Sequence, residues 1–438
     1  GRADAACGEG ELWGTGAGVR EGVAGARHGI PGAPPKMRVP SQAAFSYAPR
    51  MNERVGAALR GLSGREGVAD VDEMAERALA AGDARFLGDL GVALAGSGLG
   101  AGRHRHVFRY LLRLLCLTPG REYVEEAVRL VAATNATANG ATTTATAPPP
   151  RARYSRLAAA LLAEGQSAAE LAAIFAGGSR AHTPEELRAC LVHELVLRGT
   201  PPDEVPALAR WAHSPHWSHH PLHQLPLVLL LVEKHPVLAS NSPRGGSRSL
   251  PDPRPGDPVD PGRPGSRRPL ATDLTTDAFR AAAGAAVLNW CAESNGEYET
   301  GCWELSAPAT EDTLPELLRG LGLSSLGTTN SRRRLALTRC APEQVWGALF
   351  AAAAHGGAYN SGEHGAYGRL AAWRSLAALV GAPSDADPAR VEEVTRGCAW
   401  YGFAGSTKWF HEVAWDIGFA AVRPGGRGLA VLAATDTD

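Results

Sequence analysis

The sequence predicts a mainly α-helical protein, in which an N-terminal region of helical hairpins (a bundle or a short solenoid) precedes a C-terminal α+β domain ending in a small antiparallel sheet. Three observations predict this fold class. From 66 to 239, Ala and Leu recur at helical spacing in short stretches broken by glycine turns. After about residue 398, the period of the apolar residues changes towards that of strands. Between the two parts, eight prolines fall in a stretch almost without apolar residues.

The N-terminal part contains three kinds of segment. Residues 1–65 are rich in Gly and Ala without sustained periodicity, which predicts a flexible segment. Residues 66–239 predict the all-α helical-hairpin region, since stretches such as RYSRLAAALLAEGQSAAELAAIFAGG contain two helical patterns joined by a turn. Inside this region, residues 133–152 form a low-complexity loop rich in Thr, Ala and Pro.

One helix start in this region has a specific capping pattern. The stretch TPEELRACLVHELVLRG places Thr183 as the N-cap, Pro184 at the first helical position and Glu186 three residues after the cap. This pattern predicts a capping box between the side chains of Thr183 and Glu186.

The C-terminal part follows a Pro-rich segment, 240–272, which predicts a disordered linker because it cannot form a core. Residues 273–438 contain seven of the ten tryptophans and predict the α+β domain. Here APEQVWGALFAAAAHGG, GAYGRLAAWRSLAALVGAP and DPARVEEVTRG predict helices, CAWYGFA a strand and STKWFHEVAWDIG a helix. The last stretch, FAAVRPGGRGLAVLAA, predicts a β-hairpin that turns at Pro424-Gly425-Gly426.

Composition limits the function classes. The formal net charge of −1 gives no overall field that would favour nucleic acid or an acidic membrane. The seven cysteines are scattered without a CxxC pair, which favours free thiols in a reducing compartment. The longest apolar run, LPLVLLLV at 225–232, is far shorter than the roughly 20 residues of a membrane span. We therefore expect a soluble cytoplasmic protein with no membrane association.

A histidine-rich stretch, WAHSPHWSHHPLHQLP at 211–226, is the first candidate site. Four of its histidines would share one face of a continuous helix, namely His213, His216, His220 and His223. Pro215 and Pro221 argue against that helix, and no cysteine or carboxylate lies nearby in the sequence to complete a zinc site. We expect a solvated patch, with a native metal site as the weaker alternative, and we predict no cofactor.

The second candidate is HEVAWD at 411–416, which is similar to the HExxH zinc motif. Trp415 stands where the second histidine would be, so the motif fails as a metalloprotease signature. We expect an exposed helix surface that carries His411, Glu412 and Asp416, three residues that could still join a ligand site.

The third candidate is a glycine-rich connection between two predicted helices, AHGGAYNSGEHGAYGR at 354–369. Its polar side chains can donate, accept and titrate, and they could converge on a small ligand. The alternative is a helix–helix connection whose glycines serve only backbone geometry. The candidate ligand-binding residues are His355, Tyr359, Asn360, Glu363, His364, Tyr367 and Arg369.

Signatures of nucleic-acid binding are weak. The hairpin-like stretch around residues 161–191 has the cadence of a helix-turn-helix, but its second helix would begin with acidic TPEEL, which repels phosphate. Arg105, Arg109 and Arg113 lie four apart on one helix face without an aromatic stacking platform nearby in the sequence. We expect solvated arginines and no nucleic-acid partner.

The last hundred residues resemble a known family. The stretches ALTRCAPEQVWGALFAAAAHGGAYNSGEHGAYGRLAAWRSLAALVGAP and WFHEVAWDIGFAAVRPGGRGLAVLAATDTD are similar to a family of uncharacterised proteins from high-GC actinobacteria, described only as a domain of unknown function. The resemblance covers about 335–438. It implies a bacterial cytoplasmic origin and a shared fold, and it transfers no catalytic residue.

These observations favour a non-enzymatic interaction or scaffold protein that uses its helical hairpins to bind another protein. No phosphate-binding loop, dinucleotide fingerprint or nucleophile elbow supports an enzyme. The alternative is a small-ligand binder or enzyme with its site in the 355–369 loop. A weaker alternative is a metal-binding protein that uses the histidines of 213–223.

Overall fold

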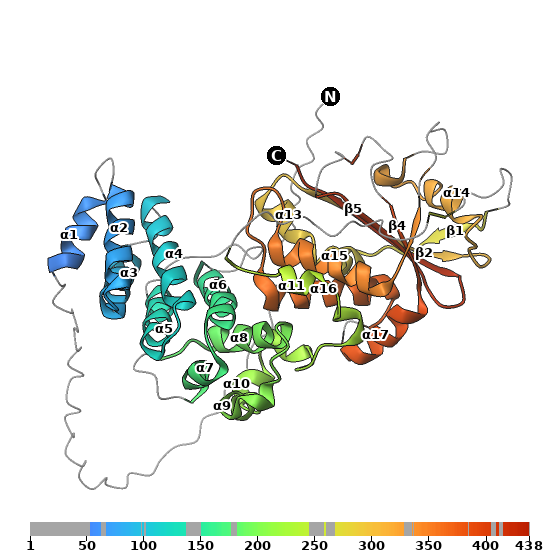
Figure 1. Cartoon of the computed structure of the whole chain (residues 1–438). Helices are drawn as coiled ribbons and strands as arrows, with labels where there is room; N and C mark the ends of the chain where they lie inside the picture. The colour runs from blue at the N-terminus through green and yellow to red at the C-terminus, as the bar shows by residue number, and fades with distance from the viewer. Residues whose placement is uncertain are drawn as a thin grey trace, which may run out of the picture. The chain divides into compact units, whose positions relative to one another are not determined.

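A computed structural model gives the fold (Figure 1). It describes residues 53–62, 67–97, 99, 102–136, 150–176, 182–244, 258–259, 268–327, 335, 337–383, 385–403, 409–410 and 415–437. Most of the segment predicted to be flexible, most of the 133–152 loop and most of the Pro-rich segment therefore lie outside the described residues.

Among the residues described between 53 and 165, six helices form two layers. They are α1 (Glu53–Gly61), α2 (Gly67–Ala80), α3 (Ala84–Ser97), α4 (Gly102–Leu117), α5 (Arg121–Ala136) and α6 (Pro150–Gly165). In one layer α4 contacts both α2 and α6, and in the second layer α3 contacts both α1 and α5. Consecutive helices also contact each other, so the predicted helical hairpins are confirmed. Helix α1 lies inside the 1–65 stretch because Val55 and Ala58 are apolar, helically spaced and buried.

Short helices continue this region to residue 240. They are α7 (Ala168–Phe175), α8 (Glu185–Leu197), α9 (Pro206–Trp211), α10 (Pro215–Ser218) and α11 (Val237–Ser240), with 3₁₀ turns η1 (Pro202–Glu204), η2 (Pro221–Gln224) and η3 (Leu231–Glu233). All thirteen residues of α8 except its first two are buried. Helix α8 is therefore an interior helix that is surrounded by other elements.

The capping box expected at the start of α8 is wrong. Pro184 itself is the cap position, with ψ of 134°, and no side chain caps the helix. Because the helix begins one residue later than expected, Thr183 lies outside capping reach, and its buried hydroxyl has no hydrogen-bond partner among the described residues. Glu186 is thus available for contacts elsewhere.

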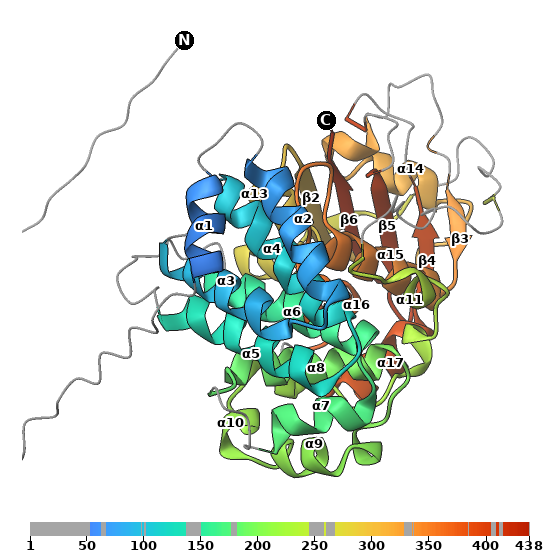
Figure 2. The same cartoon turned by 60° about the vertical axis from the view of Figure 1, so that its left-hand side comes forward.

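In the described part of the chain, the sheet has six strands, all antiparallel, in the order β1-β2-β6-β5-β4-β3. Figure 2 shows β2, β6, β5, β4 and β3 side by side in this order. The strands are β1 (Ala271–Asp273), β2 (Glu297–Leu305), β3 (Thr338–Cys340), β4 (Ala399–Gly402), β5 (Ile417–Val422) and β6 (Gly428–Thr435). Strands β5 and β6 form the predicted hairpin, and Gly425 and Gly426 supply its positive φ angles of 83° and 74°.

Both faces of the sheet are buried at the strands β5 and β6, whereas β1 at the edge is exposed. Helices α12 (Asp277–Ala283), α13 (Leu288–Glu293), α15 (Pro342–His355), α16 (His364–Val380) and α17 (Pro388–Gly397) belong to the part of the core that includes Ala430, Leu432 and Ala434 of β6. Helix α14 (Leu314–Arg319) belongs to the second core, which takes the intervening Leu429, Val431 and Ala433. Because alternate side chains of a strand point to opposite faces, a strand covered on both sides is apolar throughout. A mainly α protein with a C-terminal α+β part is confirmed.

The helix predicted over STKWFHEVAWDIG is wrong for the residues described there. Trp409 and Phe410 lie in a bend, Trp415 lies in a turn, and Ile417 begins β5. Every residue of β5 is buried, so the sequence shows no alternation that would mark it as a strand.

Elements from both sides of the Pro-rich segment share one core. Helix α16 packs against α6 and α8. The same hydrophobic cluster contains Leu191 of α8 and Leu370 of α16. The polar contacts between α8 and α16 are where several of the candidate residues meet.

Candidate functional site

The 355–369 connection does not gather its candidate residues around one point. His355 Nε2 lies 3.3 Å from Asn241 Oδ1, and the ring packs edge-on against Phe350. Tyr359 is 62% exposed. Asn360 fastens the loop, because its Oδ1 accepts hydrogen bonds from the backbone amides of Gly357 and Gly362 at 2.9 and 3.2 Å. In this half of the connection, the polar contacts of Asn360 therefore stabilise the backbone conformation of the loop.

His364 starts α16 in an uncommon backbone conformation. Its φ is 60°, in the left-handed region that residues other than glycine seldom adopt. Arg369, five residues later, lies completely buried inside the protein. The turn at His364 therefore leads directly into the part of α16 that carries the buried polar contacts.

Arg369 and Glu233 form a fully buried ion pair. Arg369 Nε donates to Glu233 Oε1 at 2.6 Å and Nη2 donates to Oε2 at 2.7 Å, and both side chains are 0% exposed. Nη1 donates to the carbonyl of Pro226 at 2.8 Å and to His193 Nδ1 at 2.9 Å, and Nη2 also donates to the carbonyl of Val228 at 2.9 Å. All five N–H donors of the guanidinium are used.

Glu233 is equally well satisfied. Besides Arg369, its carboxylate accepts hydrogen bonds from Trp373 Nε1 and from the backbone amide of Leu230, each at 2.8 Å. Each carboxylate oxygen thus accepts two hydrogen bonds, which completes the capacity of an ionised carboxylate. A ligand would have to displace an internal partner to bind here, so this pair acts as a structural element.

His193 completes the buried network as a neutral imidazole. Its Nδ1 accepts from Arg369, so the proton resides on Nε2, which donates to the carbonyl of Leu222 at 2.9 Å. Burial, and then the positive charge of Arg369, hold the pKa of His193 well below its usual 6.5. The imidazole is therefore uncharged near neutral pH.

A second polar cluster, the Glu186 cluster, brings together Arg156, Glu186, His220, Glu363 and Tyr367. His220 Nε2 lies 2.9 Å from Glu186 Oε2, and the Tyr367 hydroxyl donates to the same oxygen at 3.3 Å. Arg156 pairs with Glu363, and its guanidinium carbon lies 3.4 Å from the centre of the Tyr367 ring. The structure thus unites residues from two predicted sites: His220 of the histidine-rich stretch, and Glu363 and Tyr367 of the 355–369 connection.

The charges of this cluster follow from its contacts. Burial raises the pKa of Glu186, but the hydrogen bond from His220 and the charge of Arg156 outweigh it, so the pKa of Glu186 lies below its usual value. Burial and the neighbouring Glu186 carboxylate raise the pKa of both Tyr367 and Cys190. Glu186 is therefore a carboxylate at neutral pH, while the phenol and the thiol beside it remain protonated.

The histidine-rich stretch is divided between surface and interior. His213, His216 and His223 are exposed, whereas the His220 side chain is only 12% exposed. His220 Nδ1 accepts the backbone amide of Leu222 at 3.2 Å, so its Nε2 carries the proton towards Glu186. Among the described residues, no three His, Cys, Asp or Glu side chains lie close enough together to hold a metal ion.

The structure describes only part of the HEVAWD candidate. His411 and Glu412 lie outside the described residues. Asp416 is 7% exposed and accepts a hydrogen bond from Thr435 Oγ1 at 2.6 Å. It therefore fastens the start of β5 to the end of β6, where an exposed helix surface was expected.

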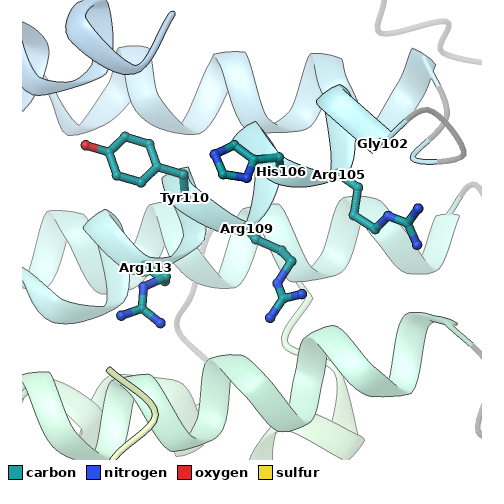
Figure 3. A pocket seen from close by; sticks show the side chains of 6 residues that line it. All are labelled: Gly102, Arg105, His106, Arg109, Tyr110 and Arg113. Carbon is teal, nitrogen blue, oxygen red and sulfur yellow. The ribbon is translucent and has the colours of Figure 1, made fainter. Parts of the chain in front are cut away.

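The surface of α4 carries a different kind of site, which we call the arginine groove. A groove of about 450 Å³ follows this helix and is lined by Gly102, Arg105, His106, Arg109, Tyr110 and Arg113. In Figure 3 the three arginine side chains leave α4 towards one side, while His106 and Tyr110 lie on the other. These are the three arginines whose spacing of four residues in the sequence predicts that they share one helix face.

The two sides of the arginine groove differ in charge. On one side, Arg105 and Arg109 are exposed, and no carboxylate among the described residues pairs with either of them. On the other side, the Tyr110 hydroxyl donates to Glu76, and His106 Nε2 lies 3.9 Å from Asp72 Oδ2. Burial and the hydrogen bond to Glu76 raise the pKa of Tyr110 to about 12, so it is a neutral phenol.

Arg113 closes one end of this arginine row. It donates to the carbonyl of Pro243 at 2.8 Å and also to that of Arg244. These contacts hold its guanidinium in place without neutralising its charge, since carbonyl oxygens carry no net charge. The row therefore presents three positive charges with one end fixed by the chain itself.

Fold and surface together define a mainly helical protein with an α+β C-terminal part and an arginine-lined groove on a helical layer. The chain belongs to a family of unknown function (DUF6183), which matches residues 69–438. The resemblance expected for 335–438 thus extends over most of the chain. No curated protein and no solved structure matches it. None of the helices in the described part combines the length and apolar composition that crossing a bilayer requires.

Proposed function

We propose that this protein is a non-enzymatic interaction protein that binds an acidic segment of a partner protein in the arginine groove of α4. One observation carries the proposal: Arg105 and Arg109 are exposed next to each other in a groove, and no carboxylate of the described chain neutralises them. Like charges four apart on a helix repel each other, and an anionic partner would remove that repulsion.

The charge distribution of the whole chain supports a local interaction. With a formal net charge of −1, the protein has no general attraction for polyanions. A basic row on a nearly neutral protein favours a partner whose acidic groups are placed to match it. Layers of helices such as α2, α4 and α6 are also typical of surfaces that bind protein segments.

The alternative, a ligand or catalytic site in the 355–369 connection, has weaker support. Glu363 and Tyr367 are already engaged by Arg156 and Glu186, and Arg369 has no N–H left for a ligand. We further propose a cytoplasmic location, since the buried free thiols of Cys116 and Cys190 are typical of proteins in reducing compartments.

Fluorescence anisotropy with labelled poly-L-glutamate tests the proposal. The double variant Arg105→Glu/Arg109→Glu should bind at least about tenfold more weakly than the wild type, because two attractive contacts become repulsive. The matched control Arg210→Glu/Arg374→Glu changes the net charge equally, at two exposed arginines outside the groove, and should bind within about twofold of the wild type.

The same assay is repeated at higher salt concentration and with single-stranded DNA as a second polyanion. Raising NaCl from about 50 to about 200 mM should weaken binding of the wild type, since exposed charges are screened. Equal loss of binding in both double variants, or no binding by the wild type, would overturn the proposal. Tighter groove-dependent binding of single-stranded DNA than of poly-L-glutamate would also overturn it, in favour of a nucleic-acid partner.

A further inference from the structure

A tyrosine of the neighbouring helix α6 lies beside the arginine row of α4. Helices α4 and α6 contact each other in the same layer. Tyr154, near the start of α6, packs its ring edge-on against Phe108 of α4, with 4.8 Å between the ring centres. Phe108 stands three residues after Arg105 and directly before Arg109, so Tyr154 lies against the part of α4 that carries both arginines.

The hydroxyl of Tyr154 is on the side of the two arginines. Phe108 is fully buried, whereas Tyr154 is only partly buried, so the ring packs inwards and the polar end of the side chain lies nearer to the surface. Burial raises the pKa of Tyr154, and the positive charges of Arg109 and Arg105 oppose this rise. Tyr154 is therefore a neutral phenol at neutral pH that can donate a hydrogen bond.

This hydroxyl and the two guanidinium groups all lack an acceptor. Among the described residues, no hydrogen-bond partner or carboxylate pairs with Tyr154, Arg105 or Arg109. Three donors from two helices thus stand together at the edge of the arginine groove without an internal partner. A donor that has no internal acceptor remains available to an acceptor from outside the chain.

The Glu186 cluster contains the same donor types together with their acceptor. There the hydroxyl of Tyr367 donates to Glu186 Oε2 at 3.3 Å, and Arg156 Nε donates to Glu186 Oε1 at 3.5 Å. One carboxylate thus serves a tyrosine and an arginine at once inside this protein. Beside Tyr154 the donors are present and only the carboxylate is missing.

From these contacts we infer that Tyr154 belongs to the partner-binding site, where its hydroxyl donates to a carboxylate of the acidic segment that Arg105 and Arg109 bind. This inference rests on the proposed function and adds a contact of a different kind. The arginines attract any negative charge, whereas the hydroxyl requires an acceptor at one position. Tyr154 therefore makes binding depend on where a carboxylate is placed as well as on the total charge of the partner.

Removing the hydroxyl alone tests this assignment. Tyr154→Phe should bind labelled poly-L-glutamate about fivefold more weakly than the wild type, because one hydrogen bond to the ligand is lost. The ring still packs on Phe108, and the hydroxyl has no internal partner, so urea unfolding should show unchanged stability. The matched control is Tyr298→Phe on β2, a partly buried tyrosine near Arg280, which is already paired with Asp277. This control should bind like the wild type.

Salt and a double-variant cycle distinguish a hydrogen bond from a change in charge. The loss in Tyr154→Phe should stay near about fivefold as NaCl rises from about 50 to about 200 mM, whereas the loss in Arg105→Glu/Arg109→Glu should shrink, since only long-range attraction is screened. If one carboxylate serves both donors, Arg109→Gln/Tyr154→Phe should lose less than the product of the two single losses.

The outcomes separate this inference from the proposed function. If Tyr154→Phe binds like the wild type while Arg105→Glu/Arg109→Glu loses affinity, the proposed function stands and the inference fails. Equal losses in Tyr154→Phe and Tyr298→Phe, or a lower stability of Tyr154→Phe, would also overturn the inference. If the wild type does not bind poly-L-glutamate, the proposed function fails together with it.

Discussion

The side chains of Arg369 and Glu233 lie 136 residues apart in the sequence and form two parallel hydrogen bonds of 2.6 and 2.7 Å without any contact with solvent. Their pairing attaches α16 to the segment 226–233 and, through His193, to α8. A buried pair of this kind favours one arrangement of three elements, because any other arrangement would leave a charge without a partner.

Replacing only one residue of the Arg369–Glu233 ion pair should destabilise the protein much more than replacing both residues. We expect Glu233→Met and Arg369→Met each to lower the free energy of unfolding by about 3–5 kcal/mol, because each leaves buried polar groups without a partner. The double variant Glu233→Met/Arg369→Met should lose clearly less than the sum of the two. Urea unfolding of the four proteins measures the coupling, and additive losses would contradict the assignment.

Stability should fall as the pH drops below about 6.5, partly because of His193. The folded state keeps this imidazole neutral, with a pKa well below the 6.5 of an unfolded chain. Below 6.5 the unfolded state therefore binds a proton that the folded state does not, and stability falls by up to about 1.4 kcal/mol per pH unit. At higher pH both states are neutral and this contribution vanishes.

Urea unfolding between pH 5 and 8 measures the proton that His193 binds in the unfolded state. His193→Gln should remove about one proton from the pH dependence, whatever it does to stability at pH 8. His213→Gln, at an exposed position, is the matched control and should keep the wild-type slope. An unchanged slope in His193→Gln would show that another group takes up the proton.

Tyr367 should contribute through both its hydroxyl and its ring. Tyr367→Phe removes the hydrogen bond to Glu186 but keeps the ring beneath Arg156, so we expect a loss of about 1 kcal/mol. Tyr367→Leu also removes the cation–π contact and should lose about 1 kcal/mol more. Thermal or urea unfolding separates the two steps. Equal losses in the two variants would mean that the ring contact contributes nothing.

The histidine-rich stretch should bind no stoichiometric transition metal. Both ring nitrogens of His220 are engaged, one with Glu186 and one with the backbone of Leu222, which leaves the exposed His213, His216 and His223 without the most buried of the four candidate ligands. Metal analysis of tag-free protein, dialysed against a weak chelator, checks this. One zinc per chain, lost in His216→Ala/His220→Ala, would contradict it.

The fold could be predicted where the signals are local. Helical spacing identified the helical-hairpin region, including both helices of RYSRLAAALLAEGQSAAELAAIFAGG, α6 and α7, and the turn Pro424-Gly425-Gly426 identified the hairpin of β5 and β6. The prediction failed at β5 itself, because a strand buried on both faces shows no alternation. It failed at Glu186 because the local motif of a capping box was favoured over partners that are 34 and 181 residues away.

The polar clusters could be predicted only in part, for a related reason. Glu363 and Tyr367 were recognisable as polar residues in a connection between helices. Arg156 and Glu233, the partners of Glu363 and Arg369 in the folded protein, stand within ordinary helical and apolar stretches and carry no local signal. The arginine row is the reverse case, because its spacing is visible in the sequence and the residues that line the groove all belong to the one helix α4.

The order of the strands has a consequence for how the chain folds as it is synthesised. Strand β6 is the last of the six to be made, yet it lies inside the sheet between β2 and β5, and its pairs include Glu304 with Gly428, 124 residues apart. The early helices make mostly local contacts and can fold first. Strand β2 must wait for β6 with its apolar surface uncovered, so a ribosome that stalls before residue 428 would release a chain prone to aggregation.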